Sequence, residues 1–119
     1  MLPKLLAIAA LSVLLPTVAQ AQEAAFAPGG NTVTLAVTGT TARVQIQTAA
    51  NNRHLRVYNA GAVAVFIACG DVAVTAATAT AMPIAPGSVE IIGGCAQTYV
   101  AGITASGTAT VYLTPGAGI

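Results

Sequence analysis

The feature that most constrains this chain is residues 62–69, AVAVFIAC, which would carry apolar side chains on both faces of an extended strand. Successive side chains of a strand point to opposite sides of the sheet, so a strand without a polar face has to be covered on both sides. We therefore expect this strand at the centre of a sheet, with a second layer of structure packed against it. Residues 53–59 predict the preceding strand, and Asn59-Ala60-Gly61 would form a tight connection between the two.

Alternating apolar and polar side chains predict further strands along the chain. Residues 82–84 would make at best an edge strand, because Pro83 and Pro86 disrupt regular pairing. Residues 72–81 fit either a short strand with a loop or a single helical turn. The other predicted strands are residues 32–37, 42–47, 88–92, 97–104 and 108–113, of which the last two would form a hairpin around residues 105–107.

This pattern predicts an all-β fold. About eight short strands and no helix after residue 21 indicate a single small antiparallel β-sandwich over residues 32–114, jelly-roll-like or barrel-like. A flexible arm of small residues, 22–31, would precede it, with Phe26 as an anchor to the body or to a neighbouring subunit, and a tail, residues 115–119, would follow. The side chains expected to point inward are Val33, Leu35, Val37, Val44, Ile46, Leu55, Val57, Ala109, Val111 and Leu113.

The beginning of the chain predicts export. Lys4 provides a positive n-region, residues 5–15 an apolar h-region, and residues 19–21 (AQA) a small-x-small cleavage site. These are the parts of a secretory signal peptide, expected as an N-terminal helix over residues 1–21. The alternative is an uncleaved anchor, but residues 5–15 fall short of the roughly 20 residues that span a bilayer. We therefore expect the mature chain in the periplasm, at the cell surface or outside the cell.

Export makes the two cysteines informative. An even number of cysteines in an oxidising compartment favours a disulfide, here between Cys69 and Cys95. In the chain-entropy model this bond would stabilise the fold by about 3 kcal/mol. Two unpaired buried thiols are the alternative. We expect no metal site, because there is no CxxC pair and His54 is the only histidine.

Charged side chains are scarce, at only 6% of the chain. Three arginines cannot form the basic patch that binding to nucleic acid or to an anionic membrane surface requires. A net charge near zero leaves little repulsion between copies and favours self-association into an oligomer. A soluble monomer with a threonine-rich surface is the alternative. Beyond the signal peptide the charged residues are Arg43, Arg53 and Arg56 against Glu23, Asp71 and Glu90.

One predicted strand presents a polar face. In residues 53–59 the side chains of His54, Arg56 and Tyr58 alternate with apolar ones and therefore share one side of the strand. These three residues form the candidate binding strip of the chain. The alternative is an ordinary solvated sheet face without a ligand.

The residue patterns of the common enzyme classes are not found in this sequence. Ser88, His54 and Asp71 can be combined into a triad on paper, but no nucleophile-elbow motif frames a serine. Asp71 and Glu90 are the only carboxylate pair to consider for glycoside hydrolysis, and we expect them at a turn and at an outward strand position. P-loop, GxGxxG and calcium-loop sequences are also missing. We therefore predict a protein that is not an enzyme and needs no cofactor.

Four segments of the chain carry a family resemblance: RVYNAG (56–61), VFIACGD (65–71), MPIAPGSVEI (82–91) and AGITASGTATVYLTPGAG (101–118). As an ordered set they resemble small phage and prophage proteins, mostly uncharacterised and regarded as virion-associated. The resemblance extends from about Arg53 to Gly118. It implies a small β-fold in a virus particle or its accessory parts, and it implies no active site.

These observations predict an exported, non-enzymatic structural or assembly β-module, phage-derived and associated with a virion or a surface. Its partner would be a second copy of the chain or another protein. The alternative is a secreted module that binds a glycan or a protein, although an aromatic sugar-binding platform is only weakly supported by three tyrosines and no tryptophan. A small hydrolase is a third class, and it would predict activity that is lost on His54→Ala.

Overall fold

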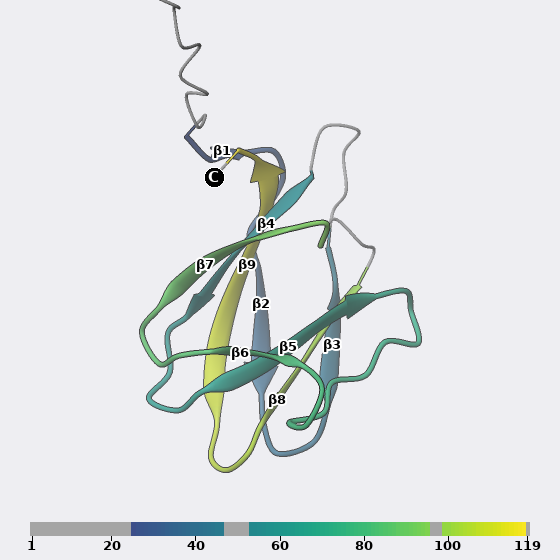
Figure 1. The fold of residues 1–119 in the computed structure, drawn as a ribbon, viewed down its shortest axis with the longest axis vertical. Coiled ribbons are helices and arrows are strands. Elements are labelled where there is room, and N and C mark those ends of the chain that lie inside the picture. The colour runs from purple at the N-terminus through teal and green to yellow at the C-terminus, as the bar shows by residue number, and fades with distance from the viewer. Residues whose placement is uncertain (1–24, 47–52, 96–98, 119) are drawn as a thin grey trace, which may run out of the picture.

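The computed structural model describes residues 25–46, 53–95 and 99–118 (Figure 1). The predicted signal peptide, residues 1–21, lies outside the described residues, as do residues 22–24 of the arm and residues 47–52. In the described part all regular elements are β-strands. The predicted all-β class is therefore confirmed.

Nine strands form two antiparallel sheets in the described part of the chain (Figure 1). Every pairing within the two sheets is antiparallel. Sheet A contains β7 (Val89–Gly93), β4 (His54–Asn59) and β9 (Ala109–Ala117), with β2 (Val33–Val37) and the short β1 (Ala27–Pro28) both paired to the other side of β9. Sheet B contains, in order, β3 (Ala42–Gln45), β8 (Tyr99–Thr104), β5 (Val65–Gly70) and β6 (Met82–Ile84).

The strand connectivity is that of a jelly roll. β2 pairs with β9, β3 with β8, β4 with β7 and β5 with β6, so the chain forms one long antiparallel ribbon that doubles back within residues 71–81. Successive pairs of this ribbon belong alternately to sheet A and sheet B, so the ribbon wraps around a single core. Eight strands arranged in this way make a jelly roll. The predicted β-sandwich is therefore confirmed. Of the two predicted forms, jelly-roll-like and barrel-like, the structure has the jelly roll.

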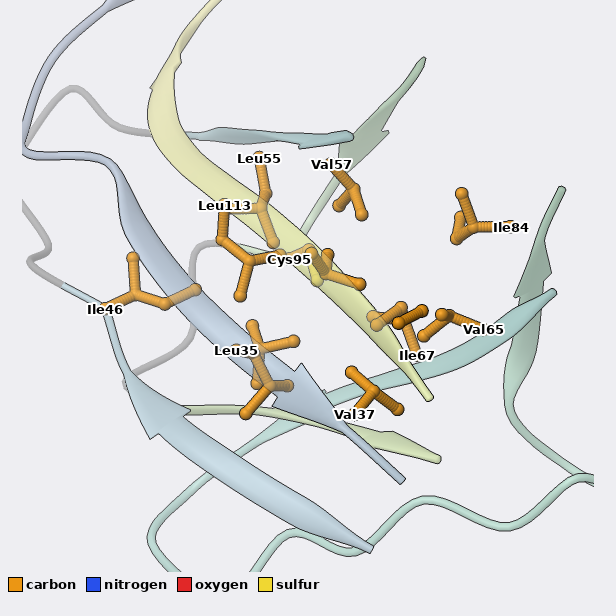
Figure 2. Packing of buried hydrophobic residues seen from close by; sticks show 13 residues of the cluster. Leu35, Val37, Ile46, Leu55, Val57, Val65, Ile67, Ile84, Cys95 and Leu113 are labelled. Carbon is orange, nitrogen blue, oxygen red and sulfur yellow. The ribbon is translucent and has the colours of Figure 1, made fainter. Parts of the chain in front are cut away.

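The core lies between the two sheets and consists mainly of aliphatic side chains, which point toward one another in Figure 2. All the side chains predicted to point inward are buried except Val33 and Val44, which are half-buried and pack against the same cluster. Each fully buried Leu, Ile or Val contributes about 1.5–3 kcal/mol relative to exposure. This cluster is therefore the main source of stability.

Two connections predicted as turns within one sheet instead cross from one sheet to the other. β4 ends at Asn59 in sheet A and β5 begins at Val65 in sheet B, so the two strands are not partners and the second starts later than predicted. β8 and β9 also lie in different sheets, which corrects the hairpin predicted around residues 105–107. Alternation reveals a strand but not its partner, because the period of two is the same whichever strand lies alongside.

Asn59 holds the crossing that follows β4, and its side chain is fully buried. Its Nδ2 donates hydrogen bonds to the carbonyl oxygens of Val63 (2.9 Å) and Ile84 (3.1 Å). Its Oδ1 accepts one from the backbone N–H of Gly61 (3.0 Å). These backbone groups have no partner strand at this point, and buried backbone N–H and C=O groups need hydrogen bonds. The Asn59 side chain supplies them.

β5 is buried on one face only, which corrects the expectation that it would be covered on both. Val65 and Ile67 belong to the core, whereas Phe66 and Ala68 on the outer face of sheet B are half-buried. The strand does lie inside sheet B, between β8 and β6, as predicted. Instead of a third layer of strands, the loop of residues 71–81 covers the end of this outer face at Gly70.

That loop folds back over the outer face of sheet B. Val74 packs where a side chain of Gly70 would stand, and the backbone N–H of Ala76 donates to Thr41 Oγ1 (2.9 Å) next to β3. Figure 1 shows the loop returning past the lower end of β3. Of the two structures predicted for residues 72–81, the loop contains a helical turn, closed by a hydrogen bond from Ala81 N–H to the Ala77 carbonyl (2.9 Å).

Both ends of the domain are part of sheet A. β9 continues to Ala117 and pairs with β4 as far as Gly116, so most of the predicted tail is a buried strand. The pattern misled because Pro and Gly between residues 115 and 118 are typical of a turn. β1 adds to the same part of β9, which corrects the expectation of a flexible arm for Ala27 and Pro28. The Phe26 ring lies against Gly116, as expected for an anchor of the arm to the body.

Replacing Gly116 by alanine is expected to detach the arm. A Cβ at this position would overlap the carbonyl oxygen of Ala27 and the ring of Phe26, so the arm would have to move. Overpacking of this kind costs about 1–3 kcal/mol, and the expected readout is faster cleavage of the arm in limited proteolysis with a lower melting temperature. Gly39→Ala is the control, because a Cβ there meets no atom within 4 Å. Equal protease resistance of the two variants would contradict the proposed contact.

Candidate functional site

The predicted disulfide between Cys69 and Cys95 is present, with 5.6 Å between the two Cα atoms. Cys69 belongs to β5 of sheet B, whereas Cys95 follows β7 of sheet A and lies among the core side chains in Figure 2. The bond therefore links the two sheets across the core. A disulfide is consistent with an oxidising, exported environment.

The candidate binding strip lies on the outer face of sheet A. His54, Arg56 and Tyr58 are all half-buried and alternate along β4 with the buried Leu55 and Val57. Because β4 lies between β7 and β9, each residue of the strip has a neighbour on both sides in the sheet. The neighbours on β9 add further aromatic and polar side chains to the strip.

Sequence reasoning missed the partners that β9 and β2 bring to this face. Tyr112 pairs with Tyr58, and the two rings lie 6.0 Å apart between centroids with 22° between their planes. Thr114 pairs with Arg56, and its hydroxyl is hydrogen-bonded to that of Thr32 (2.7 Å). Alternation along β9 did place Tyr112 outward, but more than fifty positions separate it from Tyr58. No local pattern could therefore have paired the two rings.

These side chains line a groove, which we call the tyrosine–arginine groove. Two adjoining hollows of about 460 and 440 Å³ make it up, and both are lined by Thr32, Arg56 and Thr114. The first extends under the arm to Phe26 and Pro28, and the second extends to the two tyrosines. The groove therefore runs across β4, β9 and the segment before β2.

His54 does not line either hollow of the groove. It lies between two glycines on the neighbouring strands, Gly93 and Gly116. Its imidazole ring packs over Gly93, where a side chain would otherwise stand. Its Nδ1 is buried and has no hydrogen-bond partner among the described residues. The structure thus brings two members of the predicted strip, Arg56 and Tyr58, into a common site and leaves the third in a packing position.

The backbone of Arg56 pairs with β7 and β9, but its guanidinium forms no hydrogen bond or ion pair with any other described residue. Asp71 lies at the end of β5 in the other sheet, where its Oδ1 accepts from the Ala73 N–H (2.9 Å). Glu90 pairs with Val57 and so shares the inner face of sheet A, which corrects its predicted outward position. It is still exposed because β7 is the edge strand, and an inward-pointing charge is one way in which sheet edges avoid unwanted pairing.

The side chains considered for hydrolytic chemistry are not brought together. His54 lies at the start of β4, where it pairs with Gly93. Ser88 lies near the other end of β4, directly before Val89, which pairs with Tyr58. The Ser88 hydroxyl donates to the Ala85 carbonyl within its own turn (2.7 Å). In the described part of the chain, no group of three or more His, Cys, Asp or Glu side chains is placed to hold a metal ion. No helix within the described ranges has the length and apolar character needed to cross a membrane.

A second surface feature lies where the edges of the two sheets come together, at β6 and β7. An apolar hollow of about 230 Å³ opens there and is lined by Ile67, Met82, Ile92 and the disulfide. Met82 and Val89 are 41% and 43% exposed, values that identify them as unusually accessible apolar side chains. We call this region the β6–β7 edge. It combines an apolar surface with the outer edges of β6 and β7, which pair with no further strand among the described residues.

No family model, curated protein or solved structure shows significant similarity to this chain. The resemblance to phage and prophage proteins therefore stays a prediction. The two surface features, the groove and the β6–β7 edge, are the basis on which function is argued below.

Proposed function

We propose that the protein is an exported, non-enzymatic structural module that assembles with copies of itself through the β6–β7 edge. The observation that carries this proposal is exposed apolar surface on the two edge strands: Met82 of β6 lines the apolar hollow, and Val89 of β7 is exposed on the outer face of sheet A. Unpaired edges and contiguous apolar surface are the features by which sheets associate. A second copy would cover both at once.

The low charge of the chain supports the same proposal. At the edge itself Glu90 is the one charged side chain among the residues of β6 and β7. Little electrostatic repulsion therefore opposes close approach of two copies. The jelly roll is also a fold that virus capsid proteins use for assembly.

The proposed location is outside the cytoplasm. The signal-peptide pattern of residues 1–21 and the disulfide support export to the periplasm, the cell surface or the medium. The phage resemblance of residues 53–118 supports a surface or virion-associated role. An exported module derived from a particle protein would combine both properties.

Replacing Met82 and Val89 by lysine is expected to convert the mature protein from an oligomer to a monomer. Two positive charges on each copy would face each other across the contact and would lose hydration there. Light scattering coupled to size-exclusion chromatography measures the mass. Val72→Lys is the matched control, because Val72 is 57% exposed but belongs to the loop of residues 71–81. A wild-type protein that is monomeric at high micromolar concentration would refute self-association.

A second candidate function is binding of a glycan by the tyrosine–arginine groove. The favouring observation is the pair of tyrosines beside a half-buried arginine that forms no ion pair with the described residues. Aromatic rings stack on the apolar faces of sugar rings, and hydroxyl and guanidinium groups bond their polar edges. The groove adjoins the β6–β7 edge, because Tyr58 pairs with Val89, but the two functions have separate readouts: ligand binding for the groove and oligomeric mass for the edge.

A further inference from the structure

We infer that the tyrosine–arginine groove binds a saccharide that carries a carboxylate group, such as a uronic acid unit of an acidic glycan. The inference deepens the second candidate function by naming the class of ligand, and it does not depend on the self-association proposed above. It rests on the charge of the groove, on the groups that line it and on its length.

Charge complementarity selects an anionic ligand. Arg56 is half-buried at the middle of the groove, where both hollows meet, and no carboxylate of a described residue is paired with it. Glu90 and Asp71, the two described acidic residues, lie on the inner face at the edge of sheet A and beyond β5 in sheet B. A partly desolvated guanidinium gains most from a planar carboxylate, which it can bind with two parallel hydrogen bonds.

The other lining groups select a polyhydroxylated ring. Thr32 and Thr114 share one hydrogen bond, so one of the two hydroxyl protons stays available to a ligand at the side of Arg56. Tyr58 and Tyr112 form a continuous aromatic surface on the other side, with 6.0 Å between ring centroids. Aromatic surface next to hydroxyl donors matches the apolar faces and polar edges of a sugar.

The shape of the groove favours a chain of sugar units over a single small anion. The two hollows share three lining residues and continue in opposite directions, under the arm on one side and past the tyrosines on the other. A ligand centred on Arg56 would therefore extend on both sides. The two residues that line both hollows together with Arg56, Thr32 and Thr114, carry hydroxyl groups that can bond the hydroxyl groups of such a chain.

The experiment is isothermal titration calorimetry of the mature protein with a galacturonic acid trisaccharide, its methyl ester and a trimer of glutamate. We expect the acidic trisaccharide to bind and the methyl ester, which has the same rings without the charge, to bind about tenfold more weakly or not at all. We expect Arg56→Gln to cause a loss of similar size. Arg43→Gln is the matched control, because Arg43 is exposed on sheet B, and it should bind like the wild type.

The aromatic contribution is tested in the same assay. Tyr112→Ala is expected to weaken binding of the acidic trisaccharide by about tenfold through loss of stacking, and Tyr99→Ala, on the outer side of sheet B, should have no effect on affinity. No binding by the wild type, or equal affinity for the ester, would overturn the inference even if a variant failed to fold. Binding of the glutamate trimer as tight as the trisaccharide would also overturn it. Oligomeric mass, measured separately, would be unaffected by any of these outcomes.

Discussion

Removal of the disulfide, by replacing Cys69 and Cys95 together with alanine, is expected to lower the free energy of unfolding by about 3 kcal/mol. The bond connects residues 26 positions apart, so it restricts the unfolded chain much more than the folded one. Domains of this size have a total stability of about 5–15 kcal/mol. The loss would therefore be a large part of the whole.

The measurement is a urea unfolding curve followed by tyrosine fluorescence, since the chain has three tyrosines and no tryptophan. The wild-type protein under reducing conditions is the control, because it loses the covalent link but keeps both sulfur atoms in the core. Equal stability of the reduced and oxidised proteins would show that the link contributes nothing. A larger loss for the alanine variant than for the reduced protein would measure the packing of Cys95, which is 3% exposed.

Replacing Asn59 by aspartate is expected to lower the free energy of unfolding by about 3 kcal/mol or more at pH 7. The change keeps the size of the side chain and removes its N–H donors. The carbonyl oxygens of Val63 and Ile84, which now accept from Nδ2, would then face a buried negative charge. The connection from sheet A to sheet B would lose the side chain that holds it.

The loss of stability caused by Asn59→Asp is expected to be larger at neutral pH than at acidic pH. Burial opposite two carbonyl oxygens raises the pKa of the introduced carboxyl above its unfolded-state value. The destabilisation is complete above the raised pKa and declines as the pH falls toward the unfolded-state value, where both states bind the proton. Chemical denaturation at pH 7 and at mildly acidic pH measures the difference. Gln45→Glu, an equivalent change on the exposed side of β3, is the control and should cost little at either pH. A penalty that did not shrink in acid would rule out the buried charge as its cause.

The faces of the clearly alternating strands and the disulfide pairing were predictable from sequence, and each has a local cause. Val111 and Leu113 on β9 are buried and Tyr112 between them is exposed, because alternation follows from the geometry of a single extended strand. Cys69 and Cys95 were the two cysteines of a chain predicted to be exported, so only one intramolecular bond was available. Neither prediction depends on which strands are neighbours in the sheets.

The strand partners and the groove were not predictable in this way. β4 and β9 pair although the whole of β5 to β8 lies between them in the chain, and this pairing places Tyr112 beside Tyr58 and Thr114 beside Arg56. The same lack of pairing information led to the incorrect hairpin at residues 105–107 and to the prediction of a tail where β9 continues. Pro115 and Gly116 lie in a strand because β1 and β4 flank them, and not because of their own preferences.

The sequence alone determined that this chain forms short strands with one apolar face each, because that property depends only on residues close together along the chain. The tertiary structure decided which strands meet, and therefore which polar side chains share a surface. Arg56, Tyr58, Tyr112 and Thr114 become one groove only after the ribbon has wrapped around its core. Pairing between distant strands depends on the packing of the whole molecule, in which loop closure and the burial of both inner faces must be satisfied together.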